Sequence, residues 1–446
     1  MTVPARRQST PEVAAWAWMR AYRNELLVFL CSFFALACFS GPRFLRQSAA
    51  PHFVYQAKAF LDGRLDLDPE TLPNLEDWAC VREVAGVKTR CTRPVLPGDR
   101  WYVSFPAFPA VVMLPFVAVN GWQLNDTSFG VILGALAITL FYWMARELGR
   151  RGELDRSDGE ALILAGVLGF GTLLFSCAIR GEVWFLAEVL GVVLTCVYIR
   201  AATGGARPVL AGAVWSMATL TRTPLVFTGL YFLLEVLTPG PTGRLEQLRE
   251  ALRAPRAWIG PVLRFAAGAA PLAILAMVFN WVRFGSPADF GHRFLFDNRV
   301  NADIDTHGLF SPAYLARNLE AAFLMLPRVR LSPFRLDYDP RGLSLLVTMP
   351  WLVLLVFPRT RPRLHWPVWL TVALCALPGL FYQNTGYVQF GFRFSLDYTP
   401  YLVLLLGLSG WSFRKPLVQV LVGAAVVVNT WGALAFRGYT ELMRRM

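Results

Sequence analysis

Charged residues are scarce in this chain, and their scarcity excludes an ordinary soluble domain. Only 16% of the 446 residues are Asp, Glu, Lys or Arg, whereas 55% are hydrophobic, and the mean hydropathy is +0.44. A soluble domain carries about 25% charged residues. Apolar runs of about 17–25 residues, long enough to cross a bilayer as helices, recur along the chain. The sequence therefore predicts a polytopic helical membrane protein.

Lysine is nearly missing, and this shapes the interpretation of the net charge of +13. The chain has only Lys58, Lys88 and Lys415, so almost every positive charge is an arginine. The arginines lie between apolar segments rather than in one patch, as expected for the cytoplasmic loops of a membrane protein. We therefore predict contacts with membrane lipids and no nucleic-acid partner.

Several familiar functional motifs are also missing from the sequence. It contains no P-loop, no GxGxxG after a predicted strand, no HExxH, no sustained heptad and no apparent inverted repeat. Three of the four histidines, His52, His292 and His307, fall in polar loops, where they could be acid–base groups or metal ligands. They lack metal-ligand spacing within a motif, so we assign no metal site. A divalent metal ion remains an open alternative as cofactor.

The expected fold is an all-α, polytopic transmembrane helical bundle that forms a single domain over residues 1–446. Arginines precede the first span, which places the N-terminus in the cytoplasm. Two long polar regions, 42–103 and 284–341, should then be external loops that contain short amphipathic helices. Residues 104–121 carry three prolines and are expected to form a re-entrant or tilted segment. About eleven or twelve spans are expected, depending on whether 104–121 crosses the membrane. The remaining spans are expected at 25–41, 126–146, 160–178, 183–200, 208–221, 224–238, 258–283, 342–357, 366–383, 397–412 and 416–436.

The first polar loop holds the first group of candidate residues. Residues 52–62 have the periodicity of a short amphipathic helix, which Gly63 should end. Acids gather in this loop, among them Asp62, Asp66, Asp68, Glu70, Glu76 and Asp77. Such a cluster could hold a general base, whereas any single one of these acids is more simply explained as a solvated loop residue. Cys80 and Cys91 share the loop and could form a disulfide in an oxidising compartment.

Other ionisable residues lie at the ends of apolar segments or inside them. Arg180 and Glu182 sit at a span end, whereas Glu188 falls inside the following apolar run, where an ionisable residue is a functional candidate with an expected partner. Arg222 lies at a predicted turn and could face a lipid phosphate or extend to the interface.

The segment QFGFRFSLDYTP (389–400) places two charges at the mouth of an apolar helix. Arg393 and Asp397 are four residues apart, so a helix would bring them onto one face and within reach of each other. The pair could anchor the helix at the membrane boundary, or it could form the rim of a site for a charged substrate.

The order of the motifs is more specific than any one of them. In chain order they are PHFVYQAKAFLDGRLDL, WYVSFPAFPAVVMLP, IRGEVWF, AGAVWSMATLTRTP, NWVRFGSP, HGLFSPAYLARN and QFGFRFSLDYTP. This order resembles bacterial integral-membrane glycosyltransferases of the GT-C superfamily, which includes protein O-mannosyltransferases and lipid A aminoarabinose transferases. The resemblance extends from about residue 42 to residue 400.

The resemblance implies transfer of a sugar from a polyprenyl-phosphate donor to a lipid, glycan or protein acceptor. The reaction would take place at the external, periplasmic face of a bacterial inner membrane. Many members carry an Asp-Glu pair after the first span, where this chain has Pro51 and His52. The base would then be Asp77, or else His52 or Asp62.

An enzyme that uses such a donor must also hold the leaving phosphate, and arginine suits this task because it offers paired hydrogen-bond donors. Arg393 would hold this phosphate, Asp397 would orient Arg393, and Arg222 would be a further phosphate ligand. Arg180, Glu182, Glu188 and His292 remain further site candidates.

Two alternative functions are kept open by the sequence. One is a transporter or flippase of a lipid-linked sugar or another anionic lipid. A transporter should place its ionisable residues near the bilayer midplane, whereas most candidates here lie in loops or at span ends. The other is a protein that keeps the GT-C fold but has lost activity, which the departure at His52 allows.

Overall fold

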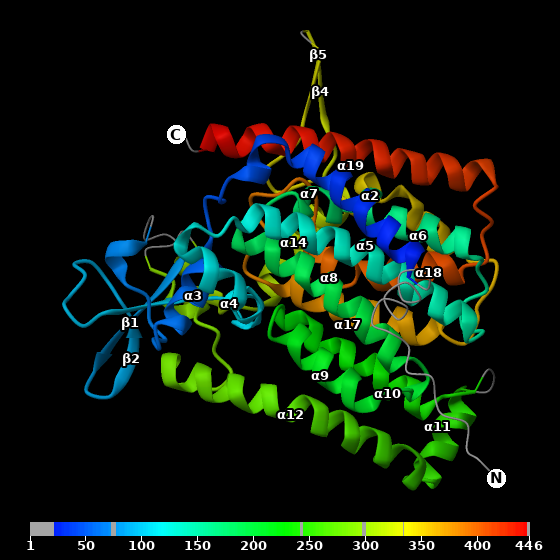
Figure 1. The fold of residues 1–446 in the computed structure, drawn as a ribbon, viewed down its shortest axis with the longest axis horizontal. Helices are drawn as coiled ribbons and strands as arrows, with labels where there is room; N and C mark the ends of the chain where they lie inside the picture. The colour runs from blue at the N-terminus through cyan, green and yellow to red at the C-terminus, as the bar shows by residue number, and fades with distance from the viewer. Residues whose placement is uncertain (1–21, 73–76, 241–243, 297–299, 333, 444–446) are drawn as a thin grey trace, which may run out of the picture.

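The protein is a bundle of apolar helices with a small β-sheet at one end (Figure 1). The structure, a computed structural model, describes residues 22–72, 77–240, 244–296, 300–332 and 334–443. Among them, five helices are long and apolar enough to cross a membrane, judged by length and composition. These are α2 (Arg23–Ser40), α5 (Asp126–Arg150), α8 (Val183–Ala202), α12 (Arg256–Phe284) and α19 (Pro416–Met443).

Shorter elements complete the bundle. The shorter apolar helices are α4 (Phe108–Asn120), α9 (Pro208–Thr219), α10 (Gly229–Leu237), α17 (His365–Phe381) and α18 (Thr399–Leu408). The remaining helices are α3 (His52–Leu61), α6 (Asp158–Phe170), α7 (Leu174–Ala178), α11 (Arg244–Arg253), α13 (Asn301–His307), α14 (Leu315–Leu319), α15 (Leu345–Thr348) and α16 (Val353–Val356).

Helices α5 and α8 form the centre of the bundle, and α2 packs on the outer side of α5. A glycine lets α5 approach its neighbours closely. A Cβ atom on Gly134 of α5 would come within 2.4 Å of the Ala178 Cβ atom of α7 and 3.0 Å of the Leu36 Cδ1 atom of α2. Helix α12 packs along α9 and leaves its other face exposed (Figure 1). Apolar side chains such as Leu263 and Trp281 cover that face, as expected for a surface in contact with lipid.

Several predicted spans are interrupted rather than continuous. The predicted span 160–178 is divided into α6 and α7, and 224–238 begins as a 3₁₀ turn, η5 (Thr223–Thr228), before α10. The predicted span 342–357 consists of α15, the 3₁₀ turn η9 (Pro350–Leu352) and α16. Proline at the start of η5 and η9 explains both breaks, because its ring is compatible with the first turn of a helix but not with the interior.

The first polar loop differs from the all-α expectation. Helix α3 and its end at Gly63, which has φ of 71°, agree with the prediction for residues 52–62. A three-stranded antiparallel sheet follows, in the order β2-β1-β3, from β1 (Trp78–Val84), β2 (Val87–Arg90) and β3 (Arg100–Val103). The second polar region also has a hairpin, β4 (Arg328–Leu331) and β5 (Phe334–Asp337).

The two polar regions meet at one end of the bundle, which we call the sheet end: β1–β3, α3 and the 3₁₀ turn η6 (His292–Phe294). The Phe296 amide donates to the Trp78 carbonyl at 2.9 Å. Arg90 on β2 forms an ion pair with Asp305 on α13 at 2.6 Å. The regions 42–103 and 284–341 are therefore joined by direct contacts, and their external location stays a prediction.

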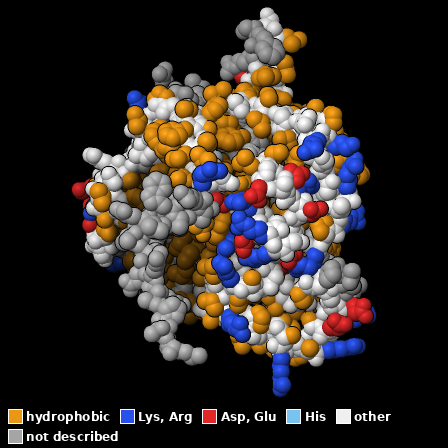
Figure 2. All heavy atoms as spheres, turned by 45° about the vertical axis from the view of Figure 1, so that its right-hand side comes forward, with side chains coloured by type: hydrophobic (Ala, Val, Ile, Leu, Met, Phe, Trp, Pro, Cys, Tyr) orange, Lys and Arg blue, Asp and Glu red, His pale blue; other side chains and the backbone are white. Residues whose placement is uncertain are grey.

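Arginine-rich loops gather at the opposite end, the arginine end, defined by Arg146, Arg156 and Arg363. Arg146 forms an ion pair with Glu25 at 2.6 Å, which ties α5 to the start of α2. Arg363 contacts Glu153 at 2.7 Å and Glu235 at 2.8 Å. Figure 2 shows charged side chains in a band on the face turned toward this end, with apolar side chains above and below.

Candidate functional site

A cavity of about 840 Å³ opens between the start of α8, the turn before η5, the end of α17 and the loop that follows α12. Its wall is mostly apolar and rich in aromatic rings, among them Trp184, Phe227 and Phe310. Ionisable side chains also line it: Arg222, Asp289, His292, Arg293, Tyr382 and Asp397. A large apolar pocket with a few convergent polar groups is the usual form of a ligand site.

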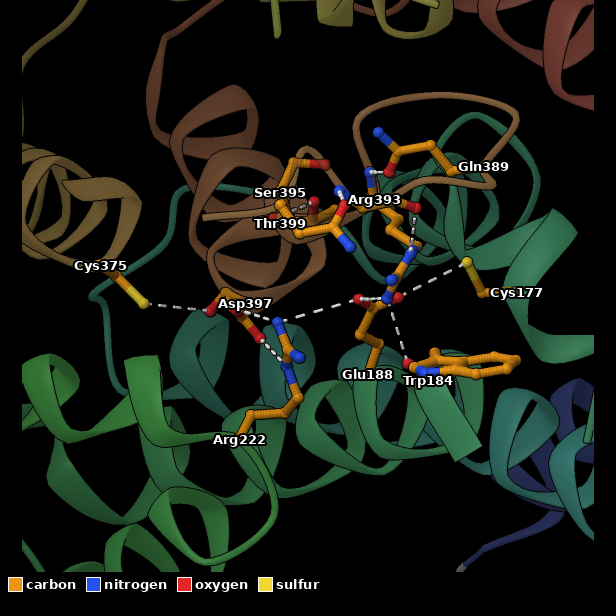
Figure 3. A network of polar contacts seen from close by, with 12 residues as sticks. Cys177, Trp184, Glu188, Arg222, Cys375, Gln389, Arg393, Ser395, Asp397 and Thr399 are labelled. Atoms are coloured by element: carbon orange, nitrogen blue, oxygen red, sulfur yellow. Dashed lines mark hydrogen bonds and ion pairs between the residues drawn. The ribbon is translucent and has the colours of Figure 1, made fainter. Parts of the chain in front are cut away.

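A buried network of two arginines and two carboxylates (Figure 3) lies beside this cavity, and two of its members, Arg222 and Asp397, line it. Arg222 donates from Nε and Nη2 to the two carboxylate oxygens of Asp397, at 2.9 and 2.7 Å. Arg393 donates from Nη1 to Glu188 Oε1 at 2.5 Å. Arg222 Nη2 is 3.8 Å from the same oxygen and so links the two pairs. The four charges balance, as buried charges must.

The predicted pairing of Arg393 with Asp397 is wrong. Residues Arg393–Asp397 form a 3₁₀ helix, η10, with about three residues per turn. Residues four apart therefore do not lie on one face, as they would on an α-helix. Arg393 turns toward Glu188 of α8, and Asp397 turns toward Arg222, which precedes η5 (Figure 3).

Arg222 and Arg393 differ in their access to the cavity. Arg393 is held from several sides, because its Nε donates to the Gly386 carbonyl at 3.2 Å and its backbone N–H donates to Gln389 Oε1 at 3.0 Å. It is not among the residues that line the cavity. Arg222 does line it, and its Nη1 has no hydrogen bond within the described part of the chain. The cavity therefore meets Arg222 rather than Arg393.

Glu188 was predicted to have a partner nearby, and that partner is Arg393. Glu188 lies just over one turn into α8, with a side chain that is 0% exposed. Glu188 itself does not line the cavity, but Trp184 and Ala187 of the same helix do.

The candidates for a base occupy different places. Asp62, at the end of α3, forms an exposed ion pair with Lys58. His52 is buried, and its ring stacks on Trp78 with 3.8 Å between centroids. Both ring nitrogens of His52 lack a hydrogen-bond partner within the described residues, and burial lowers the pKa of His52 to about 3.

Asp77 directly precedes β1, with φ of 60°, a left-handed conformation that aspartate tolerates better than most residues. Its charge acts on Tyr382, a cavity residue, and contributes to raising the pKa of that phenol, for which burial is the main cause. Asp77 itself is not among the residues that line the cavity. None of the three predicted bases therefore belongs to the cavity wall.

The cavity contains a different candidate, His292, with an acidic neighbour that the sequence reasoning missed. Asp289 lines the cavity, accepts from the Gly291 amide at 2.8 Å and pairs with Arg293 at 2.5 Å. The segment PADFGHRF places these residues within a few positions of each other, and this local clustering was the available signal.

Arg180 and Glu182 do not belong to this cavity. They pair with each other at 2.7 Å, both buried, at the start of α8. The Arg180 guanidinium lies between the rings of Phe185 and Phe436, at 4.6 and 4.3 Å from their centroids. The pair fixes α8 against α19.

Cys80 and Cys91 are joined by a disulfide within the three-stranded sheet, with 5.3 Å between their Cα atoms. These cysteines and Asp99 form the one converging group of three potential metal ligands among the described residues. The disulfide occupies both sulfur atoms, and Asp99 pairs with Arg82 at 2.7 Å. This group therefore does not fit a metal ion.

The sequence matches no protein-family model, and no curated protein matches it. Among solved structures, the chain is similar to ArnT from Cupriavidus metallidurans bound to undecaprenyl phosphate. The superposition has a TM-score of 0.49 with 13% sequence identity, and it covers 92% of this chain and 63% of that one. This chain thus spans less than two thirds of the length of the protein it matches.

Proposed function

We propose that the protein is a membrane glycosyltransferase that moves a sugar from a polyprenyl-phosphate donor to an acceptor at the sheet end. One observation carries this proposal. The cavity of about 840 Å³ has mostly apolar walls, and Arg222 is the arginine of the buried network that lines it. Asp397 fixes the orientation of Arg222 through two hydrogen bonds. Such a cavity suits a ligand with a long apolar part and one anionic group.

The geometry of Arg222 suits a phosphate. Asp397 accepts hydrogen bonds from Nε and Nη2 of Arg222, and Arg222 Nη1 makes no hydrogen bond to any described residue. A guanidinium held in this way loses little further side-chain freedom when it binds an anion. It would also stabilise the charge that develops on the phosphate as the sugar leaves.

The charges around Arg222 indicate which residues would balance the negative charge of a bound donor phosphate. The network is neutral with Asp397 and Glu188 in place. A donor phosphodiester adds one negative charge beside Arg222, and Arg293 at the cavity wall supplies a further cation, 61% exposed. We therefore assign the donor phosphate to Arg222 and Arg293, and we give Arg393 the role of supporting Glu188.

The arrangement of the two ends gives an orientation for the reaction. Arginine-rich loops lie at the arginine end, which the positive-inside rule places in the cytoplasm. The sheet end, with its disulfide, would then face an oxidising compartment, as in the periplasm of a bacterium. We propose that the cavity opens on this external side of the inner membrane, toward a lipid, glycan or protein acceptor.

A transfer assay in proteoliposomes tests the function. The protein is reconstituted with radiolabelled undecaprenyl-phosphate hexoses and pentoses, and sugar release from the lipid is followed with an envelope extract as acceptor. Release should depend on the protein, and Arg222→Gln should abolish most of it. Arg361→Gln, which changes an exposed arginine at the arginine end, is the matched control.

Movement of intact donor lipid between leaflets without sugar release would instead favour a flippase. Absence of both activities across the donor panel would contradict the proposed function.

A further inference from the structure

His292 is held against the cavity by the turn that follows α12. Gly291 has φ of 95°, and a Cβ atom there would come 2.5 Å from the Phe284 ring at the end of α12. Only glycine fits this close approach, so the turn fixes the direction of the next side chain. The His292 ring lies edge-on to Phe105 at 5.5 Å and to Tyr382 at 6.3 Å, and both rings line the cavity.

The carboxylates of the cavity wall are already engaged with arginines. Asp397 binds Arg222 through both oxygens, and Asp289 pairs with Arg293 at 2.5 Å. By contrast, His292 makes no hydrogen bond through its ring nitrogens to any residue in the described ranges. It is thus a base at the cavity wall with an available lone pair.

We infer that His292 is the proton acceptor for the sugar acceptor's hydroxyl group. This inference rests on the proposed function. In the step, the hydroxyl proton moves to the unprotonated ring nitrogen of His292, and the hydroxyl oxygen bonds to the anomeric carbon. The bond from that carbon to the phosphate oxygen breaks, and its electron pair leaves with the polyprenyl phosphate. The proton on His292 is then released to water.

The three residues predicted from the sequence are less suitable. Asp62 is exposed and paired with Lys58. His52 lies behind the cavity wall, with its ring 6.2 Å from Phe105 and 6.1 Å from Trp184, and its nitrogens are enclosed. Asp77 acts on Tyr382 through its charge but is not a lining residue. A general base must come within hydrogen-bond reach of its proton, and of these groups only His292 borders the space a substrate would occupy.

The surroundings of His292 favour its unprotonated form in the free protein. Burial lowers its pKa to about 4, Asp289 raises it in part, and Arg222 lowers it further. The other charged groups that line the cavity are Arg293 and Asp397, and the Tyr382 ring lies 6.3 Å from the His292 ring. An anionic phosphate beside His292 favours the protonated imidazole, so the pKa should rise on donor binding. The base therefore becomes stronger in the complex in which it is needed.

The matched variants are His292→Gln in the cavity and His307→Gln on α13, where the histidine is exposed. In the proteoliposome assay with the labelled undecaprenyl-phosphate sugars, His292→Gln should lower kcat by about 10²–10⁴-fold, the usual contribution of a general base. His307→Gln and Asp77→Asn should stay within a few-fold of the wild type. The inference would be overturned if Asp77→Asn lost turnover by about 10²–10⁴-fold while His292→Gln turned over normally, because the base would then be Asp77.

Chemical rescue and pH profiles separate catalysis from a structural effect. Added imidazole should restore part of the turnover of His292→Ala, with a pH dependence that follows the titration of the added imidazole. In the wild type, kcat/KM should titrate near the free-enzyme pKa of about 4, and kcat should titrate at a higher pH. Lack of rescue in a folded His292→Ala protein, together with an unchanged profile in His292→Gln, would refute the inference.

The outcomes also distinguish this inference from the proposed function. Sugar release by the wild type with full activity in His292→Gln leaves the transferase assignment standing and removes the role of His292. Absence of sugar release by the wild type removes both.

Discussion

The buried network predicts a large and specific stability effect at Glu188. Its carboxylate is 0% exposed, lies 2.5 Å from Arg393 Nη1 and 3.8 Å from Arg222 Nη2, and balances one of the two positive charges. Glu188→Gln changes the network from two positive and two negative charges to two positive and one negative. Removing one partner of a buried pair costs about 3–5 kcal/mol, because the remaining charge stays buried.

Comparison with an exposed pair gives the scale. The Lys58–Asp62 pair at the end of α3 has an aspartate side chain that is 44% exposed. Asp62→Asn should therefore lower the free energy of unfolding by only about 0–1 kcal/mol. The two substitutions make the same chemical change, from carboxylate to amide, so the difference between them reports burial rather than charge removal.

A double variant tests whether Glu188 and Arg393 act as one unit. With both charges removed in Glu188→Leu/Arg393→Met, no uncompensated charge of this pair remains, so the double variant should be more stable than either single variant. Denaturant unfolding in detergent micelles, followed by tryptophan fluorescence, measures all three. Losses that add within about 0.5 kcal/mol would show that the two residues are independent and would refute the network.

Three further predictions follow from the site and the two ends. Arg222→Lys keeps the charge but loses the fork that Asp397 holds, so affinity for undecaprenyl phosphate should fall roughly tenfold, measured by binding in nanodiscs, and unchanged affinity would contradict the phosphate assignment. Reducing the Cys80–Cys91 bridge, which has a sequence separation of 11, should cost about 3 kcal/mol and should increase proteolysis within 80–91 but little elsewhere; equal cleavage before and after reduction would count against it. Cysteines introduced at the exposed residues Glu83 and Thr306 should react with an impermeant reagent from the same side of the membrane, and labelling from opposite sides would overturn the arrangement of the sheet end.

Local patterns in the sequence predicted the elements that depend on local interactions. The amphipathic periodicity of residues 52–62 and the following glycine identified α3 and its end. The long apolar run at 258–283 identified α12 within two residues at its start and one at its end. The sheet at 78–103 was missed because its strands are only four to seven residues long and lie within a segment that was expected to be a polar loop.

The site depends on contacts between residues far apart in the chain. Glu188 and Arg393 are separated by 205 positions, and Arg222 and Asp397 by 175. Spacing within one segment therefore suggested a pair between Arg393 and Asp397, because no local pattern specifies a 3₁₀ turn there. The sequence analysis named all four charged residues as site candidates, and the structure brings them together in one network.

Photo-crosslinking with undecaprenyl phosphate that carries a diazirine near its phosphate tests the central claim most directly. We predict labelled peptides from the cavity wall around Arg222 and His292, and loss of this labelling in Arg222→Gln but not in Arg361→Gln. Labelling spread along the lipid-facing sides of α12 and α19, unaffected by Arg222→Gln, would contradict a donor site in the cavity.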